Sequence, residues 1–252
     1  MKTNLLIPLS LLYCIFFCPI SNLYAQTSAH SNIWLISSDL SNSDDQSKYI
    51  TGTNQLKQVL SDHYQVKKTI LISNLEEWNK AFSTLLTHKK NGKCPLLIFY
   101  GHANTTPNDV HFHLKGDDIS IKKVGKCLKA TTGSISIIWS AEAGRSIIPI
   151  MKGTGHVIMA ASELEDKDNE PVMSDLLVDI LKTFTIHSNQ NKQVTLADIH
   201  QEAKQQIKNW YTERQLIQLE TILMDGNGDG IGTITPDDAD LKGGKQVILK
   251  LR

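Results

Sequence analysis

Short apolar runs alternate with longer amphipathic stretches along most of the chain. We expect strands where about four to six apolar or β-branched residues follow one another without helical spacing. Continuous runs of this kind are typical of strands that are covered on both faces, and so of a mostly parallel sheet with helices on either side. Five segments meet the description: Ile33–Ser37, Thr69–Ile72, Leu96–Tyr100, Ser134–Trp139 and His156–Ala160.

The stretches between and after these runs carry apolar residues at helical spacing. A stripe predicts a helix in each case, because positions three and four apart share one helix face. We expect one helix around Leu56, Val59 and Leu60, and one over Val172–Ile186. Two further stripes are Leu75, Trp78, Phe82, Leu85 and Leu86, after a cap at Ser73 or Asn74, and Leu196, Ile199, Ala203, Ile207 and Trp210, after Thr195.

Polar stretches at 42–48, 163–170 and 188–192 predict loops. No internal repeat interrupts the order of strands and helices. The sequence therefore predicts an α/β fold, a three-layer sandwich with a mostly parallel sheet, in a single domain over residues 26–252.

The first 25 residues have the pattern of a secretory signal peptide. Lys2 precedes an apolar run from Leu5 to Ile20. The segment Leu23-Tyr24-Ala25 then ends in a small residue, as a signal-peptide cleavage site does. We expect cleavage after Ala25, no stable membrane insertion after it, and a secreted or periplasmic protein. An uncleaved membrane anchor is the alternative.

Charge and cysteine content narrow the classes of partner. The chain has 26 basic and 26 acidic residues. This balance argues against nucleic acid as a partner, because binding phosphates requires clustered Lys and Arg. Cys94 and Cys127 remain after signal cleavage, and whether they pair or stay as thiols is open.

Candidate chemistry follows three neighbouring apolar runs. Leu96–Tyr100 leads into Gly101-His102-Ala103, and Ser134–Trp139 leads into Ser140-Ala141-Glu142-Ala143-Gly144. The next run leads into Ala161-Ser162-Glu163. Ligands bind at the carboxyl ends of strands in open α/β sheets, so these residues should gather at one edge.

These segments resemble the legumain and caspase clan of cysteine peptidases, whose members carry Gly-His-Gly after one strand and Ala-Cys-x-Ser-Gly after the next. The resemblance extends over Ile33 to Gly232 and implies a caspase-like fold. It also implies that His102, after Gly101, is the general base and that Ala141 occupies the nucleophile position. The backbone amides of Ala141 and Ala103 would then form the oxyanion hole.

The same resemblance implies a specificity pocket between Ser162 and Asp168, with Ser162, Glu163 and Asp168 as substrate-binding residues. A peptide or protein would be the ligand in this cleft. No cofactor is required for the chemistry of this clan.

Ala141 departs from the clan at the nucleophile position, where the clan has cysteine. A methyl group neither ionises nor forms an acyl intermediate, so Ala141 cannot act as a nucleophile. Ser140 carries a hydroxyl, but successive side chains of a strand point in opposite directions, which turns Ser140 away. Cys127 lies in the amphipathic stretch 119–129 and is better read as a small apolar residue.

A calcium-loop pattern occupies residues 225–237. Asp225, Asn227 and Asp229 alternate with glycines, and the carbonyl of Ile231 would complete the first half of an EF-hand-type loop. Position twelve is Pro236 and not the bidentate glutamate. A structural calcium ion that stiffens this loop is one reading, and a solvated turn is the other.

His111 and His113 sit two apart and would share one strand face. This spacing is usable for a metal, but no third ligand is evident, so two surface histidines are expected.

Three functions remain open from the sequence. The first is an exported, legumain-like pseudopeptidase that binds peptide or protein without cutting it. The second is an active cysteine-type endopeptidase in nature, with a deliberate Cys-to-Ala change at position 141. The departures at Ala103 and Ala143 favour natural loss. The third is a hydrolase that uses Ser140 or a metal ion.

Overall fold

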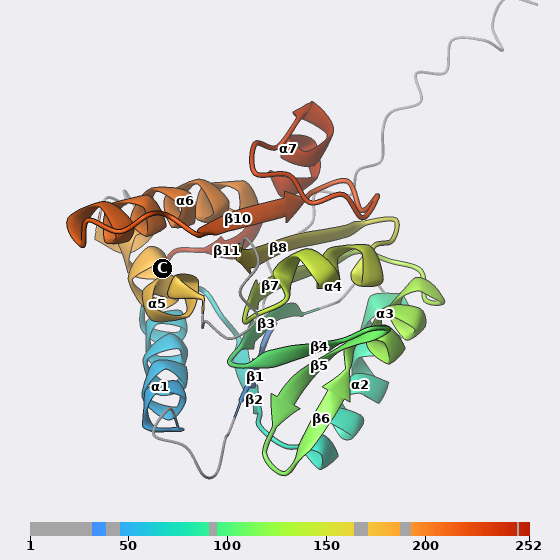
Figure 1. Ribbon diagram of the computed structural model, residues 1–252. Coiled ribbons are helices and arrows are strands. Elements are labelled where there is room, and N and C mark those ends of the chain that lie inside the picture. Colours follow the sequence, from blue (N-terminus) through green and yellow to red (C-terminus); the bar gives the residue numbers. More distant parts are fainter. Residues whose placement is uncertain (1–31, 39–45, 91–94, 164–170, 187–192, 246) are drawn as a thin grey trace, which may run out of the picture.

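The computed structural model describes residues 32–38, 46–90, 95–163, 171–186, 193–245 and 247–252. Its centre is a six-stranded sheet in the order β10-β8-β7-β3-β1-β2 (Figure 1). Five neighbouring strands are parallel, and β10 pairs antiparallel with β8 at the edge. The strands are β1 (Asn32–Ser37), β2 (Lys68–Ile72), β3 (Leu96–Tyr100), β7 (Ile135–Ser140), β8 (His156–Glu163) and β10 (Glu220–Asp225).

Helices cover both faces of the sheet (Figure 1). One face carries α1 (Gln46–His63), α5 (Val172–Ile186) and α6 (Leu196–Glu213). The other carries α2 (Leu75–Lys90), α3 (Ile121–Lys129) and α4 (Gly144–Met151). The predicted three-layer α/β sandwich is confirmed.

Side chains of the sheet alternate between two buried clusters. In β3, Leu96, Ile98 and Tyr100 pack on the α1/α5/α6 side, whereas Leu97 and Phe99 pack on the α2/α3/α4 side. This alternation follows from the strand period of two residues. All five residues of β3 are buried, as expected for a strand covered on both faces.

The five predicted strands are confirmed to within a few residues at their ends, and so are the four predicted helices. The loop predicted over 42–48 is wrong for residues 46–48, because α1 begins at Gln46, and residues 42–45 lie outside the described residues. The start of this helix is held by Tyr49, which is fully buried among the side chains of the sheet. Glu163, the first residue of the loop predicted over 163–170, belongs to β8, and residues 164–170 and 188–192 lie outside the described residues.

Two small sheets and one helix complete the described fold. A three-stranded antiparallel sheet, β4 (Ala103–Thr106), β5 (Asp109–Leu114) and β6 (Asp117–Ser120), follows directly after His102. The second pairs β9 (Gln193–Thr195) with β11 (Val247–Lys250), and α7 (Asp238–Gly244) follows β10.

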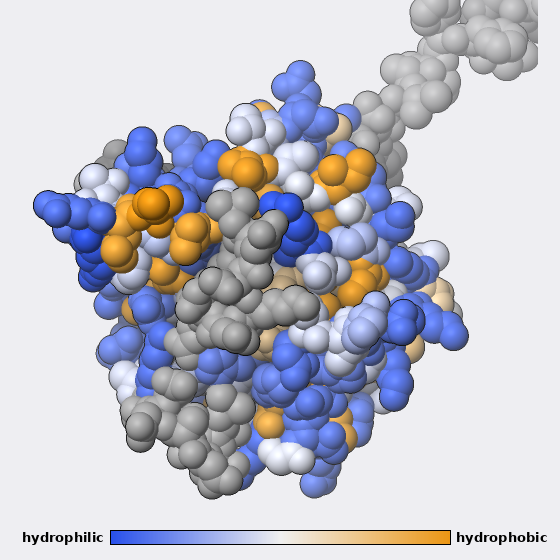
Figure 2. Space-filling model, in the orientation of Figure 1, coloured by the Kyte–Doolittle hydropathy of each residue, from blue (hydrophilic) through white to orange (hydrophobic). Residues whose placement is uncertain are grey.

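The face in Figure 2 is mostly hydrophilic, with orange clusters beside α6 and β10. The connection between these two elements contains the exposed apolar residues Leu216, Ile217 and Leu219. Within the described residues, no helix has both the length and the apolar character needed to span a membrane.

Candidate functional site

The carboxyl ends of β3 and β7 lie side by side and bring the two predicted segments together. Tyr100 pairs with Ser140, and the Gly101 amide extends the pairing by donating to the Ser140 carbonyl at 3.2 Å. Gly101 has φ +151°, and a Cβ there would lie only 2.1 Å from Ser38 Oγ. A glycine is therefore required for the chain to turn towards His102.

His102 is fixed in place by contacts from distant segments. Its backbone amide donates to Ser38 Oγ at 2.8 Å, and Ser38 Oγ donates to the His113 carbonyl at 2.8 Å. The ring of Tyr49 packs edge-on against the imidazole, with centroids 4.7 Å apart. These contacts place the imidazole at the sheet edge with 16% of its side chain exposed.

The carboxylate of Glu142 bridges the two predicted catalytic segments. Its Oε1 lies 2.8 Å from His102 Nδ1, and its Oε2 accepts from the Ala103 amide at 2.7 Å. Because a carboxylate oxygen accepts, Nδ1 carries the proton in this bond. The Ala103 amide, which the family resemblance assigns to the oxyanion hole, thus already has an acceptor.

Ala141 and Ser140 point to opposite faces of the sheet. Ala141 is fully buried and belongs to the same apolar cluster as Ala103. The Ser140 hydroxyl lies 3.2 Å from Ser174 Oγ in α5, on the other side. The Ser140 hydroxyl therefore points away from the side on which Ala141 lies, as the alternation of side chains along a strand predicts.

The turn after Ala141 is held tightly. Trp139 Nε1 donates to the Glu142 carbonyl at 2.7 Å. Ala143 adopts a left-handed conformation with φ 64°, which is uncommon for a residue with a side chain. Gly144 then starts α4 so close to β8 that a Cβ would lie 1.6 Å from the Ala161 carbonyl oxygen.

The predicted substrate-binding residues are only partly described. Ser162 is buried in β8 and pairs with Thr221 of β10. Glu163 ends β8, opposite Glu220. Asp168 lies outside the described residues, so the expected specificity pocket stays a prediction.

Comparison with solved structures identifies the architecture. The crystal structure of the Drosophila initiator caspase Dronc aligns with a TM-score of 0.52 at 11% sequence identity, over 83% of this chain and 85% of that chain. The chain has the caspase fold. At this identity the likeness establishes the fold alone and not the function of the site.

Two other alignments are weaker and carry no argument. Caspase-1 from Spodoptera frugiperda has a TM-score of 0.49 at 12% identity, over 79% of this chain and 88% of that chain. Protein GSU0716 from Geobacter sulfurreducens has a TM-score of 0.48 at 11% identity, over 83% of this chain and 96% of that chain. No protein-family model and no curated protein sequence matches this chain.

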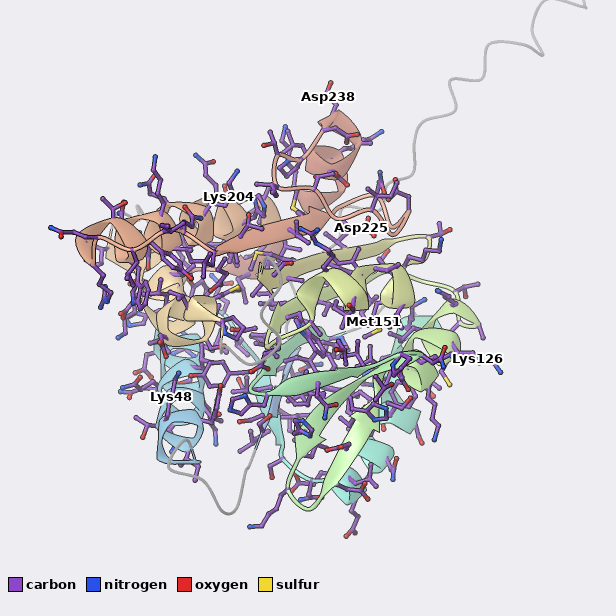
Figure 3. The ribbon with its side chains drawn as sticks, in the orientation of Figure 1. Lys48, Lys126, Met151, Lys204, Asp225 and Asp238 are labelled. Atoms are coloured by element: carbon purple, nitrogen blue, oxygen red, sulfur yellow. The ribbon has the colours of Figure 1, made fainter. Side chains whose placement is uncertain are left out.

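The calcium-like segment forms a turn at the end of β10, where Figure 3 labels Asp225. Asp225 is fully buried, and its two carboxylate oxygens accept from the amides of Gly228 and Gly230 at 2.6 and 2.9 Å. Burial raises the pKa of Asp225, and the nearby Asp229 and Asp240 carboxylates raise it further.

The other members of the pattern also take part in bonds within the loop. Asn227 Oδ1 accepts from the Asp229 amide at 2.8 Å, and Ile231 is exposed. Within the described ranges there is no group of three or more His, Cys, Asp or Glu that could hold a metal ion. The calcium pattern also uses the Asn227 amide oxygen and the Ile231 carbonyl, so calcium binding stays a prediction.

His111 and His113 share the outer face of β5, as expected. His113 Nδ1 lies 2.7 Å from an Asp118 oxygen, and His111 Nε2 lies 3.8 Å from an Asp109 oxygen. Cys127 is half-buried in α3. Because Cys94 lies outside the described residues, the pairing of the two cysteines stays open.

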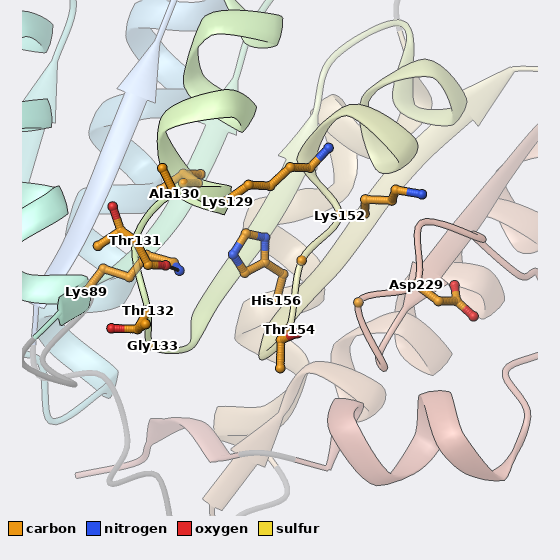
Figure 4. Close-up of a pocket in the computed structure, with 13 residues that line it drawn as sticks. Lys89, Lys129, Ala130, Thr131, Thr132, Gly133, Lys152, Thr154, His156 and Asp229 are labelled. Carbon is orange, nitrogen blue, oxygen red and sulfur yellow. Dashed lines mark hydrogen bonds between the residues drawn. The ribbon is translucent and has the colours of Figure 1, made fainter.

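A cavity of about 680 Å³ lies at the opposite end of the parallel strands (Figure 4). The buried Lys89 donates to the Thr131 carbonyl there, and the buried His156 donates from Nδ1 to the Met151 carbonyl. Burial lowers the pKa of His156, and Lys89 and Lys129 add to this effect. The residues that line this cavity do not include those beside Ala141.

Glu142, Ser38 and Tyr49 are the site residues that sequence reasoning missed. In the sequence, Glu142 belongs to the segment that resembles the clan, but nothing in its spacing indicated a bond to His102. Ser38 follows the first predicted strand, whose end should lie at the same sheet edge, and this is the one signal that could have suggested it.

Proposed function

We propose that this protein is a legumain-like pseudopeptidase that binds a peptide or protein segment at the His102 edge without cutting it. The observation that carries the proposal is the alanine at position 141. It directly follows the strand end that adjoins Gly101, and a methyl group cannot serve as the attacking group. The caspase fold supports a peptide-related function by analogy.

Peptide binding at this edge is supported by the retained architecture. His102 remains fixed by Ser38 and Tyr49, although no thiol is present at position 141 for it to activate. Export to the periplasm or the outside of the cell is part of the same proposal, and it rests on the signal-like residues 1–25.

A peptide library incubated with the purified protein tests this function. Retained peptides, identified by mass spectrometry, should be intact, and in ¹⁵N–¹H spectra they should shift the Ala103 and Glu142 amides. Cleaved peptides, produced by the wild-type protein and lost in His102→Ala, would overturn the proposal.

A structural calcium ion in the 225–237 loop remains a separate proposal, based on the alternating oxygen ligands. Calcium that binds the folded state raises the melting temperature by mass action. The wild-type protein should show this shift, and Asp229→Asn should reduce it. A melting temperature that millimolar calcium leaves unchanged would show that the loop is a solvated turn.

A further inference from the structure

We propose that the Ala103 amide and the His102 imidazole form a carboxylate-binding site, which Glu142 fills from within the chain. The outside ligand that fits this site is the free C-terminal carboxylate of a peptide. The inference rests on the proposed function and deepens it, because it names the chemical group held at the His102 edge and the residue that competes for it.

The first support is the match between one carboxylate and two donors. Each oxygen of Glu142 has its own donor, His102 Nδ1 at 2.8 Å and the Ala103 amide at 2.7 Å. Only 11% of the Glu142 side chain is exposed. A carboxylate tolerates burial when charge-assisted hydrogen bonds replace its water, so these two donors make a site of the right chemistry.

The second support is that both donors are held by groups other than Glu142. The His102 amide is bound to Ser38 Oγ, and the Tyr49 ring packs against the imidazole. The Ala103 backbone is paired with Phe112 in the small sheet. Both donors should therefore keep their positions when the Glu142 side chain leaves.

The third support is that only the side chain of Glu142 is free to leave. The Glu142 carbonyl accepts from Trp139 Nε1. The residue before it, Ala141, is fully buried, and Gly144, two residues after it, is packed against Ala161. With the backbone fixed on both sides, a rotation of the side chain opens the site without disturbing the sheet.

Competition follows from the number of donors. The Ala103 amide has a single hydrogen, and Glu142 already accepts it. A ligand that uses this amide must displace Glu142. A neutral carbonyl would exchange a charged acceptor for a weaker one, whereas a carboxylate restores both charge-assisted bonds. The site therefore selects carboxylates over amides and stays closed to weak ligands.

Titration of Glu142→Ala tests the proposal directly. The ligands are N-acetyl-dialanine, which has a free carboxylate, its C-terminal amide, and acetate. The readout is the ¹⁵N–¹H signal of Ala103 together with the His102 ring signals. Glu213→Ala, which removes an exposed glutamate at the end of α6, is the matched control.

Glu142→Ala should bind N-acetyl-dialanine about tenfold more tightly than the wild type, because the competing charge-assisted bonds are gone. Glu213→Ala should bind like the wild type, and the peptide amide should not bind to any variant. Acetate that binds as tightly as N-acetyl-dialanine would overturn the assignment to a peptide C-terminus.

Glu142→Gln keeps the size of the side chain and removes its charge, so it decides the matter if Glu142→Ala does not fold. We expect it to bind the carboxylate more tightly than the wild type does. Folded variants that bind no better than the wild type would overturn the proposal. Peptide cleavage by the wild type would refute the proposed function, but it would leave the difference between the variants readable.

Discussion

At the residue scale, the site depends on how a few side chains are held at two adjacent strand ends. The positions of Gly101, His102 and Ala141 could be predicted, because apolar strands deliver the residues after them to one edge. The bond between Glu142 and His102 joins residues 40 positions apart. Ser38 reaches His102 across 64 positions. Contacts of this kind depend on tertiary packing and leave no local pattern in the sequence.

Ala143 provides a test of the turn that positions Glu142. Its left-handed backbone is strained for an alanine, so Ala143→Gly should stabilise the fold by up to about 1 kcal/mol. Chemical denaturation measures this difference. Ala81→Gly in the middle of α2 is the control. It should destabilise the fold by about 1 kcal/mol, because glycine loses more conformational freedom than alanine when it enters a helix. A destabilising Ala143→Gly would contradict the strained turn.

At the element scale, long apolar strands and striped helices were predictable, whereas β10 and α4 were not. The apolar part of β10 is brief, and its final residue, Asp225, also fits the start of a calcium loop. Pro149 lies inside α4 and is a signal against a helix, although the helix forms around it. The antiparallel edge strand and α4 both obtain their stability from packing on the sheet.

Glu220 connects two of these elements and gives a second test. It is buried in β10, and its carboxylate accepts from the amides of Val172 and Met173 at the start of α5. Glu220→Ala removes the acceptor of these two buried amides, so it should destabilise the fold by about 3 kcal/mol. Glu220→Gln, which keeps one acceptor, should cost less.

Urea denaturation of both Glu220 variants measures the difference. Glu213→Ala at the exposed end of α6 is the control and should change stability little. Equal stability of Glu220→Ala and the wild type would contradict the capping role.

At the scale of the whole molecule, the α/β sandwich was predictable because strand and helix patterns alternate along nearly the whole chain. The caspase fold follows from that alternation together with the segments around His102 and Ala141. The expected specificity pocket was carried by the resemblance alone, and its central residues fall outside the described ranges.

Buried histidines should make the whole fold sensitive to acid. Burial lowers the pKa of His200 to about 4, and burial also lowers the pKa of His156. Below pH 6.5 the unfolded chain binds protons that the folded state excludes, so stability should fall between about pH 6.5 and 4. Asp225, whose pKa is raised, opposes this loss at the acidic end, because its folded state holds a proton more readily.

Denaturation of His200→Gln across this pH range measures the effect. The variant should lose up to about 3 kcal/mol less than the wild type between pH 6.5 and 4. His63→Gln, at the exposed end of α1, should follow the wild-type curve. Identical pH profiles for His200→Gln and the wild type would contradict the role of this histidine.

The central claim is that this caspase fold holds His102 at a sheet edge whose neighbouring residue Ala141 cannot act as a nucleophile. The most direct measurement is the rate of hydrolysis of a mixed peptide library by the wild-type protein, beside His102→Ala and thiol-alkylated protein. We predict that all three rates equal the rate in buffer. Hydrolysis by the wild type that His102→Ala or alkylation abolishes would contradict the account.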